Sequence, residues 1–143
     1  MKNELNQHPM IGKYIEHNEF GKLLGMDFEI LEPGVVRYNL TVEKKHLATP
    51  RAIHGGCTAA LIDATMGVGA LSLVLHLNQV VATLELKVSY LNSIPEGKQI
   101  YCISEKMKEG KDLIFMEATV LDESGKKYAR GSGTFVKSIK FEK

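Results

Sequence analysis

One short segment carries residue types that could act together on a carbonyl group. His54, Gly55 and Gly56 directly precede a long apolar run, and Asp63 is the one charged residue within positions 55–75. A carboxylate among apolar side chains loses hydration, so such an acid usually has a function. Glycines at a helix start let a ligand approach N–H groups that have no partner within the helix. Those N–H groups suit an oxygen that becomes negative during a reaction.

A long helix is predicted to position these groups. Residues 55–75 are small or apolar almost throughout, which is typical of a helix buried on all sides. At about 1.5 Å per residue the run would reach roughly 30 Å. Because Asp63 interrupts it and His76 follows it, we predict a core helix rather than a membrane span. In a purely structural interpretation, the glycines only allow a tight turn and Asp63 pairs with a distant Lys or Arg.

Changes in apolar spacing predict the other elements. Ile11 to Leu24 reads as one amphipathic helix or two short ones, ended by Gly25. Alternation then predicts a β-hairpin around Glu32-Pro33-Gly34. Further strands are predicted at Val80–Leu91, Gln99–Met107, Leu113–Leu121 and Lys127–Val136. Antiparallel strands around one buried helix give an α+β fold.

The composition limits the possible classes of protein. A chain of 143 residues with 44% hydrophobic content suits a single domain over residues 1–143, with a flexible segment at 1–9. Eighteen basic against 17 acidic residues do not indicate a nucleic-acid binder. Cys57 and Cys102 make no disulfide framework, and without a signal-peptide pattern we expect reduced thiols in a cytoplasm. Cys57 is interpreted as a small core residue rather than a nucleophile.

The motif resembles a known family. His54-Gly55-Gly56, six further residues, Asp63 and then Gly67 are similar to the helix motif of the PaaI-type acyl-CoA thioesterases of the hotdog superfamily. The similarity extends over about residues 17 to 137 and includes Phe20–Gly25. It implies a hotdog fold, in which an antiparallel sheet wraps a long central helix, and hydrolysis of an acyl-CoA or related acyl thioester. No motif for a metal or nucleotide is found, so no cofactor is implied.

The resemblance also implies roles for individual residues. Gly55 N–H would polarise the thioester carbonyl, Asp63 would act as general base or as nucleophile, and Thr83 would reach the same site. His54, Gly56 and Leu84 would contact the substrate. Two structural interpretations stay open: Thr83 as an ordinary β-branched strand residue, and His54 as a group that caps and orients the glycine turn.

One departure from the family pattern leaves the activity open. The family commonly carries an Asn six residues before the motif His, where it is thought to hold the attacking water, and this chain has Ala48 there. Thr49 is an adjacent candidate to replace it. A non-catalytic acyl-CoA-binding or regulatory protein is therefore one alternative. A hydroxyacyl thioester dehydratase is another, although the His and acid motifs of those enzymes are not found.

The spacing within the motif predicts an oligomer. Gly55 and Asp63 are eight residues apart, so one straight helix separates their backbones by about 12 Å. Both groups must come within about 3 Å of the same carbonyl. An antiparallel second copy would set Gly55 of one chain opposite Asp63 of the other. We therefore expect a homodimer or homotetramer with shared active sites and an acyl-thioester substrate, without nucleic-acid or membrane partners.

Overall fold

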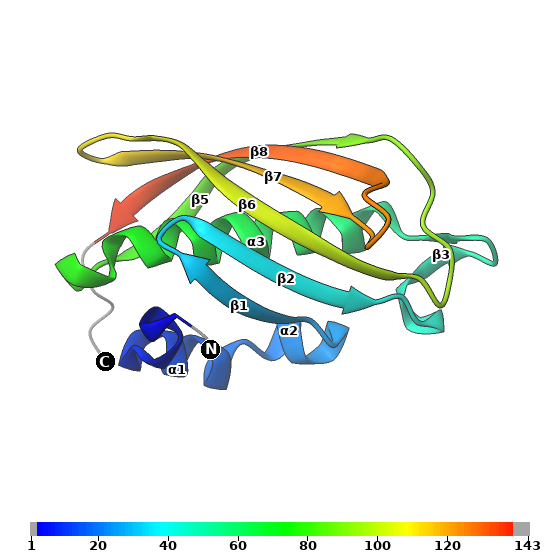
Figure 1. Cartoon of the computed structure of the whole chain (residues 1–143), viewed down its shortest axis with the longest axis horizontal. Coiled ribbons are helices and arrows are strands. Elements are labelled where there is room, and N and C mark those ends of the chain that lie inside the picture. The colour runs from blue at the N-terminus through cyan, green and yellow to red at the C-terminus, as the bar shows by residue number, and fades with distance from the viewer. Residues whose placement is uncertain (1–2, 139–143) are drawn as a thin grey trace.

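A long helix occupies the centre of the protein. The computed structural model describes residues 3–138, and in it α3 (Gly55–Val74) runs beneath a curved sheet and continues into the 3-10 helix η3 (Leu75–Leu77) (Figure 1). The helical segment of residues 55–77 is long and apolar enough to cross a membrane, but 72% of its most apolar 18-residue stretch is buried inside the protein. The predicted core helix is confirmed, because the surrounding sheet covers these apolar side chains.

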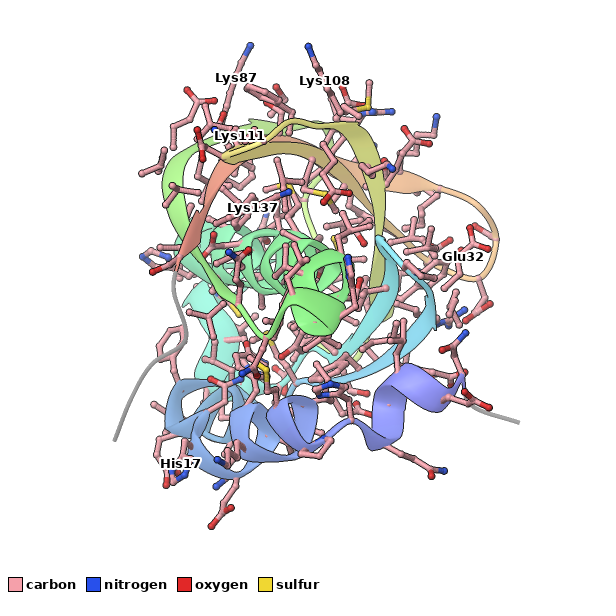
Figure 2. All side chains as sticks on the ribbon, turned by 90° about the vertical axis from the view of Figure 1, so that its left-hand side faces the viewer. His17, Glu32, Lys87, Lys108, Lys111 and Lys137 are labelled. Atoms are coloured by element: carbon pink, nitrogen blue, oxygen red, sulfur yellow. The ribbon has the colours of Figure 1, made fainter. Side chains whose placement is uncertain are left out.

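The sheet has six antiparallel strands in the order β1-β2-β6-β7-β8-β5. The strands are β1 (Asp27–Glu32), β2 (Val35–Thr41), β5 (Val80–Tyr90), β6 (Gln99–Glu109), β7 (Leu113–Leu121) and β8 (Lys127–Ser138). Viewed along α3, the sheet arches around the helix (Figure 2). The α+β hotdog arrangement expected from the sequence is confirmed.

Two short helices cover α3 on the side away from β7 and β8. These are α1 (Pro9–His17) and α2 (Glu19–Leu24), and Gly25 ends α2 in a left-handed conformation (φ 74°), as predicted (Figures 1 and 2). Ile11 on α1 is fully buried, whereas Ile15 is 51% exposed. Before α1, the 3-10 helix η1 (Glu4–Gln7) joins the sheet, because the Asn6 side chain bonds both backbone groups of Ile30. The flexibility expected for residues 1–9 stays a prediction.

The segment before α3 contains structure that the sequence pattern did not predict. After the 3-10 helix η2 (Lys44–His46), β3 (Leu47–Thr49) and β4 (Ala52–Ile53) pair as a small separate sheet. It brings the chain to His54, the N-cap residue of α3.

Strand β5 differs from the predicted alternating strand. It lies at an edge of the sheet, pairs with β8 and bulges between Thr83 and Glu85. Residues 82–87 are all exposed, including Leu84 at 59% and Leu86 at 39%. Side chains that alternate along β5 are therefore exposed on both faces, because no strand among residues 3–138 pairs with this edge.

Candidate functional site

The structure brings Asp63 and Thr83 together. Asp63 lies on the third turn of α3 and is partly buried, while Thr83 lies on the neighbouring edge strand β5. Within the described part of the chain, one side-chain hydrogen bond reaches the Asp63 carboxylate: Thr83 Oγ1 donates to Oδ1 at 3.0 Å. Two of the three predicted catalytic residues are thus in contact. The carboxylate keeps acceptor capacity for a water molecule or a substrate group.

Asp63 and Thr83 border a cavity of about 1050 Å³ between α1, α3 and the start of β5. Ala64, Gly67 and Leu71 of α3 form one wall, and Met10 and Tyr14 belong to the opposite side on α1. This volume slightly exceeds the usual range of about 300 to 1,000 Å³ for small-molecule sites. The cavity therefore places the acid beside a space large enough for an organic substrate.

Tyr14 is a site residue that the sequence did not single out. Its ring is tilted against that of Phe28, and its hydroxyl oxygen accepts a hydrogen bond from Asn18 Nδ2 at 3.3 Å. Burial raises the pKa of Tyr14, and the Asp63 charge raises it further, while a hydrogen bond with Tyr38 acts in the opposite direction. The hydroxyl thus keeps its proton in a cavity that also contains Asp63. Its place in the apolar pattern of residues 11–24 gave no sign of this position.

The entrance to α3 has the glycine geometry that the motif predicts. The His54 side chain accepts a hydrogen bond from Gly56 N–H through Nδ1 at 2.8 Å, so His54 caps the helix. A Cβ on Gly56 would lie 2.9 Å from that nitrogen, which explains the second glycine. Within residues 3–138, nothing accepts a hydrogen bond from Gly55 N–H. Gly55 therefore offers the free donor of this turn, whereas the Gly56 donor is in use.

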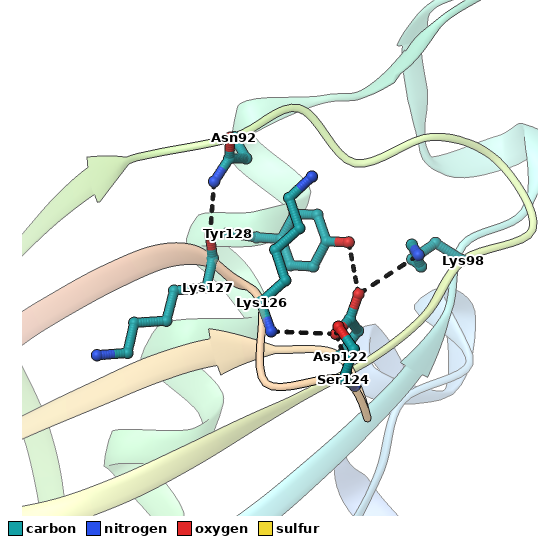
Figure 3. A network of polar contacts seen from close by, with 7 residues as sticks. All are labelled: Asn92, Lys98, Asp122, Ser124, Lys126, Lys127 and Tyr128. Atoms are coloured by element: carbon teal, nitrogen blue, oxygen red, sulfur yellow. Dashed lines mark hydrogen bonds and ion pairs between the residues drawn. The ribbon is translucent and has the colours of Figure 1, made fainter.

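Gly55 borders a second cavity, of about 310 Å³, together with Thr58, Tyr90 and Tyr128. Tyr90 was not predicted as a site residue, yet its hydroxyl donates to the Gly55 carbonyl oxygen at 2.7 Å. The Tyr128 hydroxyl donates a hydrogen bond to Asp122 Oδ2 at 2.7 Å (Figure 3). No described residue borders both this cavity and the one that contains Asp63. Within one chain, Gly55 and Asp63 therefore border different cavities, although the predicted chemistry needs the Gly55 N–H and the Asp63 carboxylate at the same carbonyl.

The remaining predicted residues take less direct positions. Leu84 borders neither of the two cavities and lies exposed at the bulge of β5, so its substrate contact stays a prediction. Ala48 is exposed on β3, and the Thr49 hydroxyl accepts a hydrogen bond from Arg51 N–H at 3.2 Å. This hydrogen bond uses one lone pair of the hydroxyl that was considered as a replacement for the family Asn, and leaves its O–H donor available. Cys57 is 8% exposed and burial raises its pKa, so its thiol is poorly suited to nucleophilic attack.

Comparison with known proteins agrees with this architecture. The sequence matches the family model of the Thioesterase superfamily over residues 51–129. Acyl-coenzyme A thioesterase 13 of Homo sapiens is 28% identical over 105 residues, which cover 71% of this chain and 72% of that protein.

Two solved structures share the fold. The E. coli PaaI protein from the phenylacetic acid degradation operon superposes with a TM-score of 0.85 at 17% identity, covering 95% of this chain and 96% of the other. The smu.793 protein of Streptococcus mutans UA159, solved bound to acetyl CoA, gives a TM-score of 0.73 at 22% identity and covers 82% of this chain and 91% of the other. With its family match, its wrapped central helix and its glycine-acid motif, the chain belongs to the thioesterase superfamily and has the hotdog fold of PaaI.

Proposed function

We propose that this protein hydrolyses an acyl-CoA or a closely related acyl thioester to the free acid and the thiol. The observation that carries the proposal is the Asp63 carboxylate, which Thr83 orients in a cavity of about 1050 Å³. Membership of the thioesterase superfamily supports the reaction class. The complex of smu.793 with acetyl CoA is an example of a similar fold that binds this kind of ligand.

In the proposed reaction, Gly55 N–H donates to the thioester oxygen while negative charge develops there. One such donor typically contributes about 3 kcal/mol. As a general base, Asp63 takes a proton from water, whose oxygen bonds to the carbonyl carbon. The C–S bond then breaks, and the departing sulfur receives that proton. As a nucleophile, Asp63 would instead displace the thiolate to form a mixed anhydride, which water cleaves to return the carboxylate.

An assay of product release tests the activity. Wild-type protein is incubated with a panel of acyl-CoAs, from acetyl to palmitoyl and including an aromatic acyl group, and free thiol is measured. We expect release of thiol that follows saturation kinetics. Saturable binding without turnover would contradict the proposed hydrolysis and favour a non-catalytic acyl-CoA-binding protein. The observation that favours this alternative is the exposed Ala48 at the position where the family commonly has Asn.

We also propose that each active site is shared between two copies of the chain. Gly55 and Asp63 border separate cavities, and their backbones are about 12 Å apart along α3. The edge strand β5 exposes Leu84 and Leu86 together with a row of backbone groups that no strand of the described chain pairs with, which is a template for strand pairing. A two-fold axis at this edge would bring α3 of one copy near α3 of the other.

Complementation between two inactive variants tests the shared site. An Asp63→Ala chain is refolded with a Gly55→Pro chain, which lacks the N–H. Proline suits a first helical position, and the extended backbone of His54 (ψ 131°) suits the residue before it. With random pairing, about half of the dimers are heterodimers, and each heterodimer has one intact site of two. About a quarter of wild-type activity should therefore return. If the mixture exchanges subunits and stays inactive, the shared site is wrong.

A further inference from the structure

The Asp63 cavity continues along α3 well beyond the acid. Asp63, Ala64, Gly67 and Leu71 follow one another at intervals of one, three and four residues and all border it. Residues three or four apart share one face of a helix, as Ala64, Gly67 and Leu71 do, and Asp63 lies four residues before Gly67. Ala64 and Gly67 are small, so they leave space beside Asp63. Leu71 borders the far end of this face with a larger apolar side chain. The cavity therefore has an apolar wall that starts at the proposed reacting group.

Helix α1 closes this space on the other side. Met10 and Tyr14, which are four residues apart, border the cavity from α1, and Lys13 and His17 of the same helix border it as well. Buried Ile11 anchors the helix to the core from the same segment. The family match begins at residue 51, so α1 lies outside the part of the chain that it covers. The wall opposite α3 is thus supplied by a segment that the motif does not predict.

Resting on the proposed thioester hydrolysis, we infer that the acyl group of the substrate lies between α1 and the Ala64–Leu71 face of α3, and that this protein prefers unbranched apolar acyl chains of medium length. From Asp63 to Leu71 the helix rises by about 12 Å, which is comparable to an extended decanoyl chain. Gly67 and Met10 then determine the length that fits, one from each wall.

Gly67 allows a sharp test because a Cβ there fits the fold. An added Cβ would meet Phe135 Cε1 at 3.7 Å, an ordinary contact. Gly67→Leu should fold and fill the cavity next to Asp63. We expect its kcat/KM for decanoyl-CoA, relative to acetyl-CoA, to fall at least about tenfold. Gly12→Leu is the matched control, because Gly12 is exposed on α1 with nothing within 4 Å of its Cβ and does not border the cavity.

A second pair of variants tests the α1 wall. Met10→Ala enlarges the cavity and should raise kcat/KM for palmitoyl-CoA relative to decanoyl-CoA by about tenfold. Ile15→Ala is the control from the same helix, because Ile15 is 51% exposed and does not border the cavity. An unchanged chain-length profile in folded Gly67→Leu and Met10→Ala proteins would overturn the inference.

The inference and the proposed function fail in different ways. If the wild-type protein turns over no acyl-CoA at all, hydrolysis is wrong, and decanoyl-CoA binding is then measured by calorimetry. Weaker binding by Gly67→Leu than by wild type and Gly12→Leu would still support the acyl-binding cavity. Equal binding by all three proteins would overturn it.

Discussion

Two aspartates of this protein occupy opposite kinds of environment. Asp122, at the start of the β7–β8 hairpin, is 7% exposed and surrounded by donors (Figure 3). Its Oδ1 accepts from the Ser124 hydroxyl at 2.6 Å and from two backbone N–H groups, and its Oδ2 accepts from Tyr128 at 2.7 Å and lies 3.4 Å from Lys98 Nζ. Asp63 has one such partner among the described residues, Thr83.

The difference separates a structural acid from an acid that is available for chemistry. The Ser124 and Tyr128 hydroxyls hold the pKa of Asp122 well below its usual range, so this carboxylate is fixed in its charged form. Its lone pairs accept hydrogen bonds from Ser124, Lys126 and Tyr128 of the same hairpin. Asp63 faces a cavity, and beyond the Thr83 hydrogen bond its acceptor positions are accessible to water or a substrate group. Substitutions at the two positions should therefore have opposite consequences.

The largest expected effect is the loss of activity in Asp63→Asn. The amide can neither take a proton from water nor attack the thioester, so kcat should fall at least about a hundredfold. The Tm should not fall, because Asn accepts the Thr83 hydrogen bond and removes a partly buried charge. Thiol release and thermal unfolding of the same preparation measure both quantities. Near-normal turnover by the folded variant would exclude Asp63 as base or nucleophile.

A smaller effect is expected for Thr83→Val, which keeps the shape and deletes the hydroxyl. Loss of the hydrogen bond to the carboxylate should lower kcat/KM about tenfold. The Tm should stay near that of wild type, because Thr83 is exposed. Thr134→Val is the matched control, since Thr134 Oγ1 donates to the Glu85 carboxylate at 3.1 Å and borders neither cavity. Equal kinetics in both variants would leave Thr83 as an ordinary strand residue.

The sequence predicted the fold better than the site. The core helix and the strands follow from patterns that run over many residues, and burial of those patterns determines the architecture. The sheet of β3 and β4 was missed because strands of three and two residues show no periodicity. Strand β5 shows a different limit, since its position at an uncovered edge depends on the order of the strands.

The arrangement of the candidate site was predicted where its residues belong to one motif or follow the family pattern, while their catalytic roles stay predictions. The contact of Asp63 with Thr83 followed from the resemblance, and the geometry of Gly55 and Gly56 from helix capping. Tyr14 and Tyr90 were missed because tertiary packing alone brings them to Asp63 and Gly55. Asp122 lies between the predicted strands Leu113–Leu121 and Lys127–Val136, and the sequence pattern did not single it out, because its donors come together only when the hairpin closes.

Asp122→Asn should lower stability with little effect on chemistry. The variant removes the charge that Lys98 and the hydroxyl donors surround, so we expect Tm to fall by several degrees at neutral pH, while kcat of the folded protein stays close to wild type. Glu123→Gln is a control from the same loop. Its side chain is 72% exposed and pairs with Arg37 at the surface, so its substitution should change Tm very little.

The pH dependence of this Tm difference gives the sharpest form of the comparison. The pKa of Asp122 is lowered in the folded protein from its ordinary value of 3.8, so the folded state favours the charged carboxylate. Its stabilising contribution is fully present above that value and is lost as the pH falls towards the lower folded pKa. The Tm gap between wild type and Asp122→Asn should therefore be widest at neutral pH and shrink towards about pH 2. Thermal unfolding of both proteins across this range measures it, and a gap independent of pH would mean that the hairpin depends on the shape of residue 122 rather than on its charge.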